Sequence, residues 1–236
     1  MTRPARLPSA RAALPALLLA LVPLAACSGD SDAPTEDPEV VLAEAQEVLA
    51  STSGLRLSLT TDDLPQGVTG VTRAEGVATA APAFDGVIEV PFAGSEVEVP
   101  VISVDGTVYA QIPLTVGWSE VDPAEYGAPD PAALVDPRTG FPGLLTSTYG
   151  VQVGDSVRGG EGNREVLTEY SGTVPGEAVA GIIPTAVGEF DVTYTITDDA
   201  EVREVVMTGA FYPDADRMTY TVGLDDYGLE QEITAP

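Results

Sequence analysis

After Gly54 the chain breaks into short runs in which apolar and polar residues alternate, and this pattern constrains the fold most. Alternation with a period of two places apolar side chains on one face of a β-strand. The alternating runs are residues 55–60, 84–92, 96–101, 192–196, 201–209 and 218–223. Ala93-Gly94 and Asp105-Gly106 separate some of them, and Asp-Gly is typical of a two-residue hairpin turn. Connections this short predict an antiparallel sheet that is covered on one face only.

Helical spacing is confined to a few segments. Residues 39–53 form the one long stretch with apolar residues at i, i+4, i+7 and i+8, and Gly54 suits its end. The proline-rich segment 122–150 carries short apolar groups that predict short helices, and 176–183 predicts another. The sequence therefore predicts an α+β fold: one large curved antiparallel sheet with a few helices on its inner face.

The first 27 residues have the pattern of an export signal. A basic start containing three arginines precedes the apolar run 12–26, which ends in Leu24-Ala25-Ala26-Cys27. That run of about 15 apolar residues is shorter than the ~20 needed to cross a bilayer. Leu-Ala-Ala-Cys resembles a bacterial lipobox, whose cysteine receives a diacylglycerol group and an N-acyl chain. A plain secretory signal with an incidental cysteine is the alternative.

This interpretation divides the chain into three parts. Residues 1–26 are expected to be a lipoprotein signal peptide, and 27–38 an acylated Cys27 followed by a disordered polar tether. Residues 39–236 are expected to form a single domain. Two or three acyl chains hold a protein durably on a membrane, so we expect the domain at the outer face of the cytoplasmic membrane.

Composition excludes several classes of function. The sequence has 10 basic residues, all arginine, against 37 acidic ones, and its net charge is −27. Nucleic-acid binding needs clustered basic side chains and is excluded as a function. With no histidine, no lysine and an acylated cysteine, the usual catalytic triads, Schiff bases and thiol nucleophiles are missing. We expect a binding protein without metal or cofactor rather than an enzyme, and a solubilising role for the acidic surface.

The strongest positive signal is the apolar face of the predicted sheet. Its expected inner residues are Leu57, Leu59, Ile88, Val90, Phe92, Val97, Val99 and Val101. A large sheet under small helices can enclose an apolar void that takes an apolar ligand. The same residues can equally form an ordinary packed core, and the pattern is compatible with both.

Residues 86–110 resemble the central hairpin of the actinobacterial LppX/LprA/LprF/LprG lipoproteins. Other segments resemble the same family in order and spacing: 117–119 (GWS), 130–132 (DPA), 136–140 (DPRTG) and 227–228 (YG), followed by an expected last strand at 230–233. The similarity extends over essentially the whole chain after the lipobox.

The resemblance implies a half-barrel with helices inside it, around an apolar cavity for the acyl chains of a lipid or glycolipid. Ile88, Val90 and Phe92 would line this cavity, and opposite them or at its mouth would lie Val99, Val101, Leu144 and Leu145. The predicted function is that of a monomeric carrier between the membrane and the cell envelope, in some relatives beside a membrane transporter. The alternative is a non-carrier module that regulates or scaffolds a membrane protein.

Overall fold

The computed structural model describes residues 37–126 and 128–236 of the chain. These described residues form one compact unit. The predicted signal peptide, Cys27 and all but the end of the predicted tether lie outside the described residues. Within the described residues, no helix is both long and apolar enough to span a bilayer.

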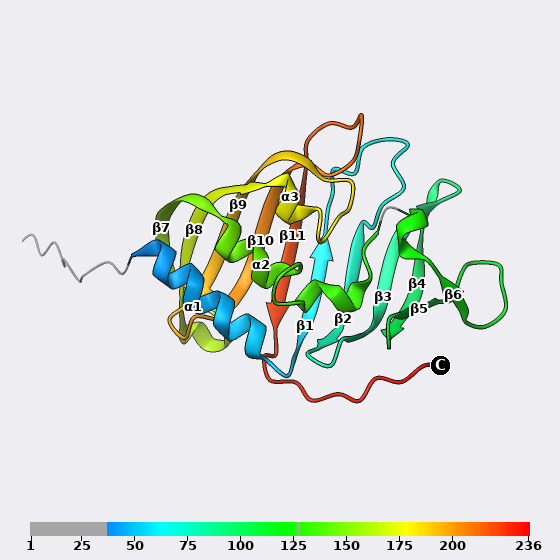
Figure 1. Cartoon of the computed structure of the whole chain (residues 1–236), viewed down its shortest axis with the longest axis horizontal. Helices are drawn as coiled ribbons and strands as arrows, with labels where there is room; N and C mark the ends of the chain where they lie inside the picture. Colours follow the sequence, from blue (N-terminus) through cyan, green and yellow to red (C-terminus); the bar gives the residue numbers. More distant parts are fainter. Residues whose placement is uncertain (1–36, 127) are drawn as a thin grey trace, which may run out of the picture. The chain divides into compact units, whose positions relative to one another are not determined.

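The core of the fold is one open antiparallel sheet of eleven strands (Figure 1). The strands lie in the order β6-β5-β4-β3-β2-β1-β11-β10-β9-β8-β7, so β6 and β7 are its edges. Their bounds are β1 Gly54–Thr60, β2 Arg73–Thr79, β3 Ala83–Phe92, β4 Ser95–Val104, β5 Thr107–Ala110, β6 Ser119–Val121, β7 Tyr149–Gly159, β8 Glu165–Pro175, β9 Val187–Thr197, β10 Val202–Ala210 and β11 Met218–Asp225.

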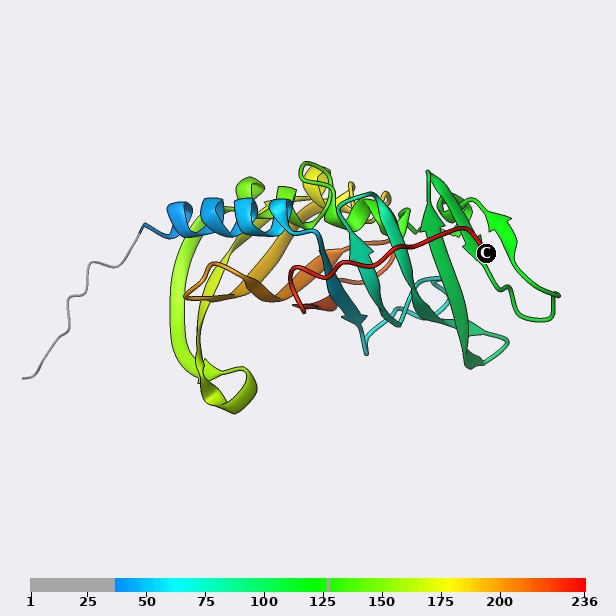
Figure 2. The same cartoon turned by 90° about the horizontal axis from the view of Figure 1, so that it is seen from below.

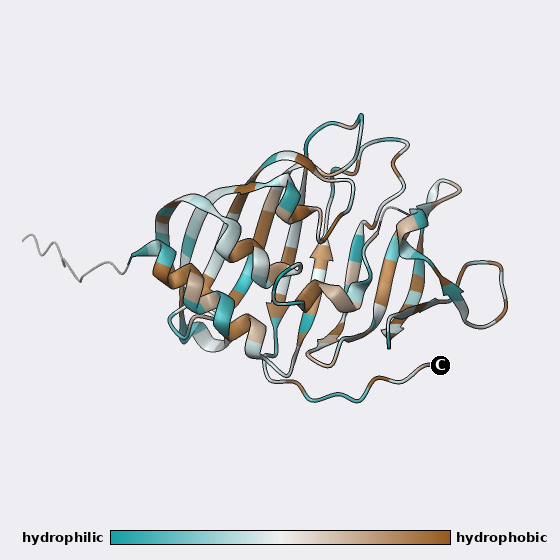
Figure 3. Cartoon of the chain, in the orientation of Figure 1, coloured by the Kyte–Doolittle hydropathy of each residue, from teal (hydrophilic) through white to brown (hydrophobic). Residues whose placement is uncertain are grey.

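A layer of short helices lies on one face of this sheet, called the inner face below (Figure 2). The α-helices are α1 Pro38–Ser51, α2 Phe141–Ser147 and α3 Gly176–Val179, and the 3-10 helices are η1 Pro123–Tyr126, η2 Pro131–Val135 and η3 Glu161–Asn163. Apolar bands alternate with polar ones along the strands (Figure 3). The predicted α+β class, an open antiparallel sheet with few helices, is confirmed.

Helix α1 follows the predicted helical spacing. Its first turn is capped by Asp37, whose Oδ1 accepts a hydrogen bond of 3.1 Å from the backbone N–H of Glu39, and Pro38 occupies the first helical position. The buried side chains are Val41, Leu42, Ala45 and Leu49. The helix packs along α2 and over the inner face of the sheet.

Six strands coincide with predicted alternating runs: β1, β3, β4, β9, β10 and β11. Asp105 and Gly106 have φ values of 54° and 74°, as a type I′ hairpin turn requires. The strand expected at 230–233 is wrong, since these residues are irregular. They follow β11, which already pairs with β1 on one side and β10 on the other, so they have no unpaired neighbouring strand where they leave the sheet.

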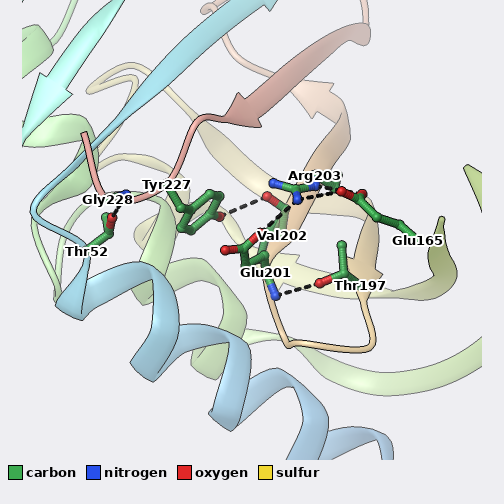
Figure 4. Close-up of polar contacts among 8 residues, drawn as sticks. All are labelled: Thr52, Glu165, Thr197, Glu201, Val202, Arg203, Tyr227 and Gly228. Carbon is green, nitrogen blue, oxygen red and sulfur yellow. Dashed lines mark hydrogen bonds and ion pairs between the residues drawn. The ribbon is translucent and has the colours of Figure 1, made fainter. Parts of the chain in front are cut away.

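The segment after β11 is instead tied to the junction between α1 and β1 (Figure 4). The backbone N–H of Gly228 donates to Thr52 Oγ1 at 2.9 Å, and that of Leu229 donates to the carbonyl of Gly54 at 3.0 Å. The Tyr227 hydroxyl donates to the Val202 carbonyl at 2.8 Å. These bonds fix the segment after β11 to the beginning of β1 and to β10.

An arginine network lies beside this tie (Figure 4). Arg203 donates two hydrogen bonds of 3.0 and 3.1 Å to the carboxylate of Glu165 and forms an ion pair of 2.8 Å with Glu201. Its guanidinium lies 5.9 Å from the centre of the Tyr227 ring. The network joins β8, β10 and the C-terminal segment. The guanidinium also lowers the pKa of the Glu165 carboxyl.

Candidate functional site

The inner face carries two separate apolar clusters, and they divide the sheet. The first involves β1 and the strands from β8 to β11 under α1, α2 and α3, with Leu134 of η2 at its border. Together with edge strand β7 we call this part the filled half. The second involves strands from β2 to β5 under η2; together with β6 we call this part the thin half. The two halves differ in the size of their side chains and in the helices that cover them.

Large side chains occupy the interior of the filled half. The rings of Phe190 and Phe211 meet edge-on with centres 4.7 Å apart, and those of Phe211 and Tyr220 meet at 5.0 Å. The Tyr194 and Thr148 hydroxyls share a hydrogen bond of 2.8 Å. Burial raises the pKa of both Tyr194 and Tyr220. Because these rings share one buried cluster with side chains from the three helices, the filled half is an ordinary packed core.

The thin half has small residues where the filled half has large ones. Ala74, Gly76 and Ala78 of β2 pair with inner-face residues of β1 and β3. A Cβ built on Gly76 would lie 2.5 Å from Phe84 Cζ, and one built on Gly86 would lie 2.6 Å from it. The Phe84 ring therefore lies against both glycines, in the space that their side chains would need.

A single short 3-10 helix, η2, covers this half. Its cap is Asp130, whose Oδ1 accepts hydrogen bonds from the Ala132 N–H at 2.9 Å and from the buried Ser103 hydroxyl. Pro131 opens the helix, so the Asp-Pro pair of the sequence is a helix start. Between η2, the end of α1 and the turn after β2 lies a pocket of about 210 Å³, whose lining includes Leu49, Ala78, Ala80, Pro82, Ala132 and Val135.

An apolar stripe runs along the inner face of the β3–β4 hairpin, and we call it the hairpin track. Cross-strand pairing fixes its order: Val90 faces Val97, and Ile88 faces Val99. Exposure falls along it, from 48% at Phe92 at the tip to 7% at Val99 and 5% at Val101. Ile88, Val90 and Val97 lie between these extremes and are half-buried. The track leads from solvent to the cluster under η2.

The structure separates the predicted lining residues into two groups. Leu57, Leu144 and Leu145 are buried in the filled half, and Leu59 packs against the same cluster. The residues brought together in the thin half are Ile88, Val90, Phe92, Val97, Val99 and Val101, with Phe92 exposed at the tip. That they line a lipid cavity stays a prediction.

The pocket residues from α1, the β2–β3 turn and η2 did not follow from the sequence. They are mostly alanine and proline, and no periodic pattern links the end of a helix with a turn about 30 residues later in the sequence. The Asp130-Pro131 pair was the available signal, since it marks the start of η2.

Charged ligand-binding groups are scarce in this region. Residues 74–137 contain no basic side chain. Arg73, just before them, forms an ion pair of 3.5 Å with Glu89. Both residues alternate with the inner-face residues of their strands and so belong to the outer face of the sheet. Within the described part of the chain, no group of three or more histidine, cysteine, aspartate or glutamate side chains could hold a metal ion.

Comparison with known proteins then gives the relationship. A sequence model of the LppX_LprAFG lipoproteins matches residues 37–234. The chain belongs to this family. The predicted resemblance is thereby confirmed, and the match covers both halves of the sheet. No curated protein sequence matches the chain.

Two solved mycobacterial structures have the fold of this family member. LprF from Mycobacterium bovis aligns with a TM-score of 0.69 and 17% identity, over 84% of this chain and 96% of that one. LppX from Mycobacterium tuberculosis aligns with a TM-score of 0.61 and 15% identity, over 84% of this chain and 98% of that one. At this identity the likeness concerns the fold.

Proposed function

We propose that this lipoprotein binds the acyl chains of a lipid in the thin half and carries the lipid between the membrane and the cell envelope. In this proposal Cys27 anchors the chain at the outer face of the cytoplasmic membrane. The observation that carries it is the hairpin track. An apolar stripe that passes gradually from solvent into a core is suited to an extended hydrocarbon chain.

Burial of methylene groups would supply the affinity. Each buried methylene contributes about 0.8 kcal/mol, so several of them along Val90, Val97 and Ile88 make a stable complex. These three side chains are half-buried, so they retain apolar surface that a ligand can cover.

Deeper binding would require η2 to move. The pocket of about 210 Å³ beside η2 is smaller than the ~300–1,000 Å³ of most small-molecule sites. Helix η2 has only five residues and depends on the Asp130 cap. Displacing it would join the pocket to the hairpin track over Ala78, Phe84 and Val99.

The charge distribution favours an uncharged ligand headgroup. A phosphate is normally bound by arginine, lysine or a helix N-terminus, and residues 74–137 supply no basic side chain. Neutral acyl lipids and glycolipids, whose headgroups need hydrogen bonds only, suit this region better. A binding role without catalysis accords with the absence of histidine and lysine from the sequence.

The experiment compares two tryptophan substitutions on one strand. Ile88→Trp fills the hairpin track, whereas Val87→Trp places the same ring on the opposite face, where Val87 is 38% exposed. Native mass spectrometry of residues 35–236 should find acyl lipid on the wild type and on V87W, and at least fivefold less on I88W. Equal lipid on both variants, or none on a wild type purified from several hosts, contradicts the proposal.

A second candidate function has its own observation. Val99 and Val101 are already buried, and the adjoining pocket is small, as expected of a fully packed module. Such a protein would regulate or scaffold a membrane protein, for example a transporter, without carrying lipid. It predicts a lipid-free wild type and an I88W variant that is destabilised by overpacking, by about 1–3 kcal/mol.

A further inference from the structure

The loop between β5 and β6, residues 111–118, presents two aliphatic side chains entirely to solvent. Leu114 is 95% exposed and Val116 is 101% exposed. The next most exposed large apolar residues in the described chain, Val157 and Val187, reach 57%. The loop projects from the thin half at the β6 edge of the sheet, and Figure 3 shows hydrophobic colouring along it.

This loop has a defined turn rather than a random course. The backbone N–H and the hydroxyl of Thr115 both donate to the Ile112 carbonyl, at 3.2 and 2.8 Å. Leu114 has a φ of 70°, in the left-handed region that a leucine seldom adopts, and Gly117 has a φ of 79°. The turn holds Leu114 and Val116 outward on either side of Thr115.

The composition around the tip is unusual for so acidic a chain. Residues 106–119 contain no charged side chain, although the sequence has a net charge of −27. Trp118, the only tryptophan, follows the tip and is half-buried. Tryptophan is enriched where protein meets the membrane–water interface, since its ring is apolar and its N–H needs a polar partner.

We propose that this loop inserts Leu114 and Val116 into the lipid surface to which the protein is anchored. The inference rests on the anchored location proposed above. Nine residues lie between Cys27 and Asp37, and the ten Cα–Cα steps that join the two span at most about 35 Å. Eleven strands spaced by ~4.8 Å make the sheet about 50 Å wide. A tilted or flat orientation therefore lets the β6 edge touch the bilayer within reach of the tether.

The size of the contact favours a bilayer over a protein partner. Two side chains on a narrow loop bury far less than the ~1,000 Å² of a specific protein interface. The anchor makes the membrane contact intramolecular, so even a weak interaction is occupied. The tip of the β3–β4 hairpin lies toward the same end of the sheet as the β5–β6 loop in both views (Figures 1 and 2), and Phe92 at the end of β3 is exposed. Docking there would bring the open end of the hairpin track to the lipid surface.

Trp118 provides the test in the full anchored chain. The chain is reconstituted in phosphatidylcholine vesicles whose acyl chains carry bromine, and the quenching of tryptophan fluorescence is measured. We expect clear quenching in the wild type and at least a fivefold smaller effect in a Leu114→Asp/Val116→Asp double variant. Val157→Asp and Val187→Asp, which change comparably apolar positions elsewhere, should quench like the wild type.

Counting bound lipid separates this inference from the carrier proposal. The double variant should retain the wild-type amount of non-covalently bound lipid while losing the quenching. A wild type without bound lipid but with Leu114-dependent quenching removes the carrier function and leaves the docking loop. The proposal that this loop docks on the membrane is overturned if Trp118 is not quenched in the wild type, or if it is quenched as strongly in the double variant as in the wild type. Crosslinking of Leu114 to a protein in native membranes, without quenching in pure lipid, would also overturn it.

Discussion

The two halves of the sheet share one strand pattern but differ in what lies on it. In the filled half, rings such as Phe190, Phe211 and Tyr220 share one buried cluster with side chains from three α-helices. In the thin half, Ala74, Gly76 and Gly86 carry almost no side chain, the Phe84 ring lies against the two glycines, and a five-residue helix covers the sheet. The contrast indicates that the filled half supplies most of the packed core, and under the proposed function the thin half keeps apolar surface for a ligand.

The largest expected effect tests this division with one substitution in each half. Phe190 and Phe84 are both nearly inaccessible, at 0% and 1% exposure. Phe190→Ala should lower the free energy of unfolding by about 3–5 kcal/mol, as for phenylalanines in closed cores. Phe84→Ala should cost less, about 2 kcal/mol, because its cross-strand partner Ala78 lines the pocket and few large side chains surround it, and it should increase bound lipid. Urea denaturation measures the free energy of unfolding of both variants. Equal losses in the two variants would contradict the difference in packing between the two halves.

Alkaline pH should act first on the filled half. Burial raises the pKa of Tyr194 and Tyr220 above the ordinary value of 10.0. The stabilisation by the neutral rings is complete below pH 10. Above pH 10 each ring costs about 1.4 kcal/mol per pH unit, since the unfolded state ionises first.

Two optical signals follow this loss in the two halves. Near-ultraviolet circular dichroism of the tyrosines reports the filled half, and Trp118 fluorescence reports the thin half. Tyr194→Phe should flatten the decline above pH 10. If both signals disappear together in the wild type, the halves unfold as one cooperative unit.

Loosening η2 should produce a smaller and local effect. Asp130→Ala removes the cap and the partner of the Ser103 hydroxyl, and we expect a loss of about 1 kcal/mol with faster exchange of bound lipid. Asp37→Ala removes the cap of α1 in the filled half and serves as the matched control. If D37A is destabilised as much as D130A but exchanges lipid at the wild-type rate, the faster exchange in D130A is caused by loosening of η2.

The smallest effect concerns acid pH. Hydrogen bonds from the backbone N–H groups of Arg138 and Thr139, and from the Thr139 hydroxyl, lower the pKa of the Asp136 carboxyl below its ordinary 3.8. The stabilisation they give is present above pH 3.8 and is lost as the pH falls through the lowered value. Thermal unfolding between pH 6 and 2.5 should show a weaker acid dependence for Asp136→Asn than for the wild type.

Alternation predicted the strands whose inner residues are large and aliphatic or aromatic. It missed β2, because residues such as Ala74 and Gly76 carry no hydrophobic signal, and it missed β7, whose residues are almost all exposed. It also missed β6, which has only three residues, and β8. The period-two alternation along β3 and β4 correctly placed Ile88, Val90, Val97 and Val99 on one face of the sheet. How deeply each residue is buried could not be predicted, because it depends on η2 and α1, which come from elsewhere in the sequence. For the same reason the sequence did not show that Leu144 and Leu145, expected opposite Ile88, Val90 and Phe92 or at the mouth of the cavity, lie in the filled half.

The position of β1 has a mechanical consequence. The chain passes from α1 directly into β1, which lies between β2 and β11 at the middle of the sheet, and the bonds from Gly228 and Leu229 hold that junction. A pulling force transmitted along the tether would thus load a central strand in shear, against hydrogen bonds on both flanks. Peeling a strand from the edge of a sheet needs far less force. This topology therefore resists unfolding of the domain when it is pulled through its tether.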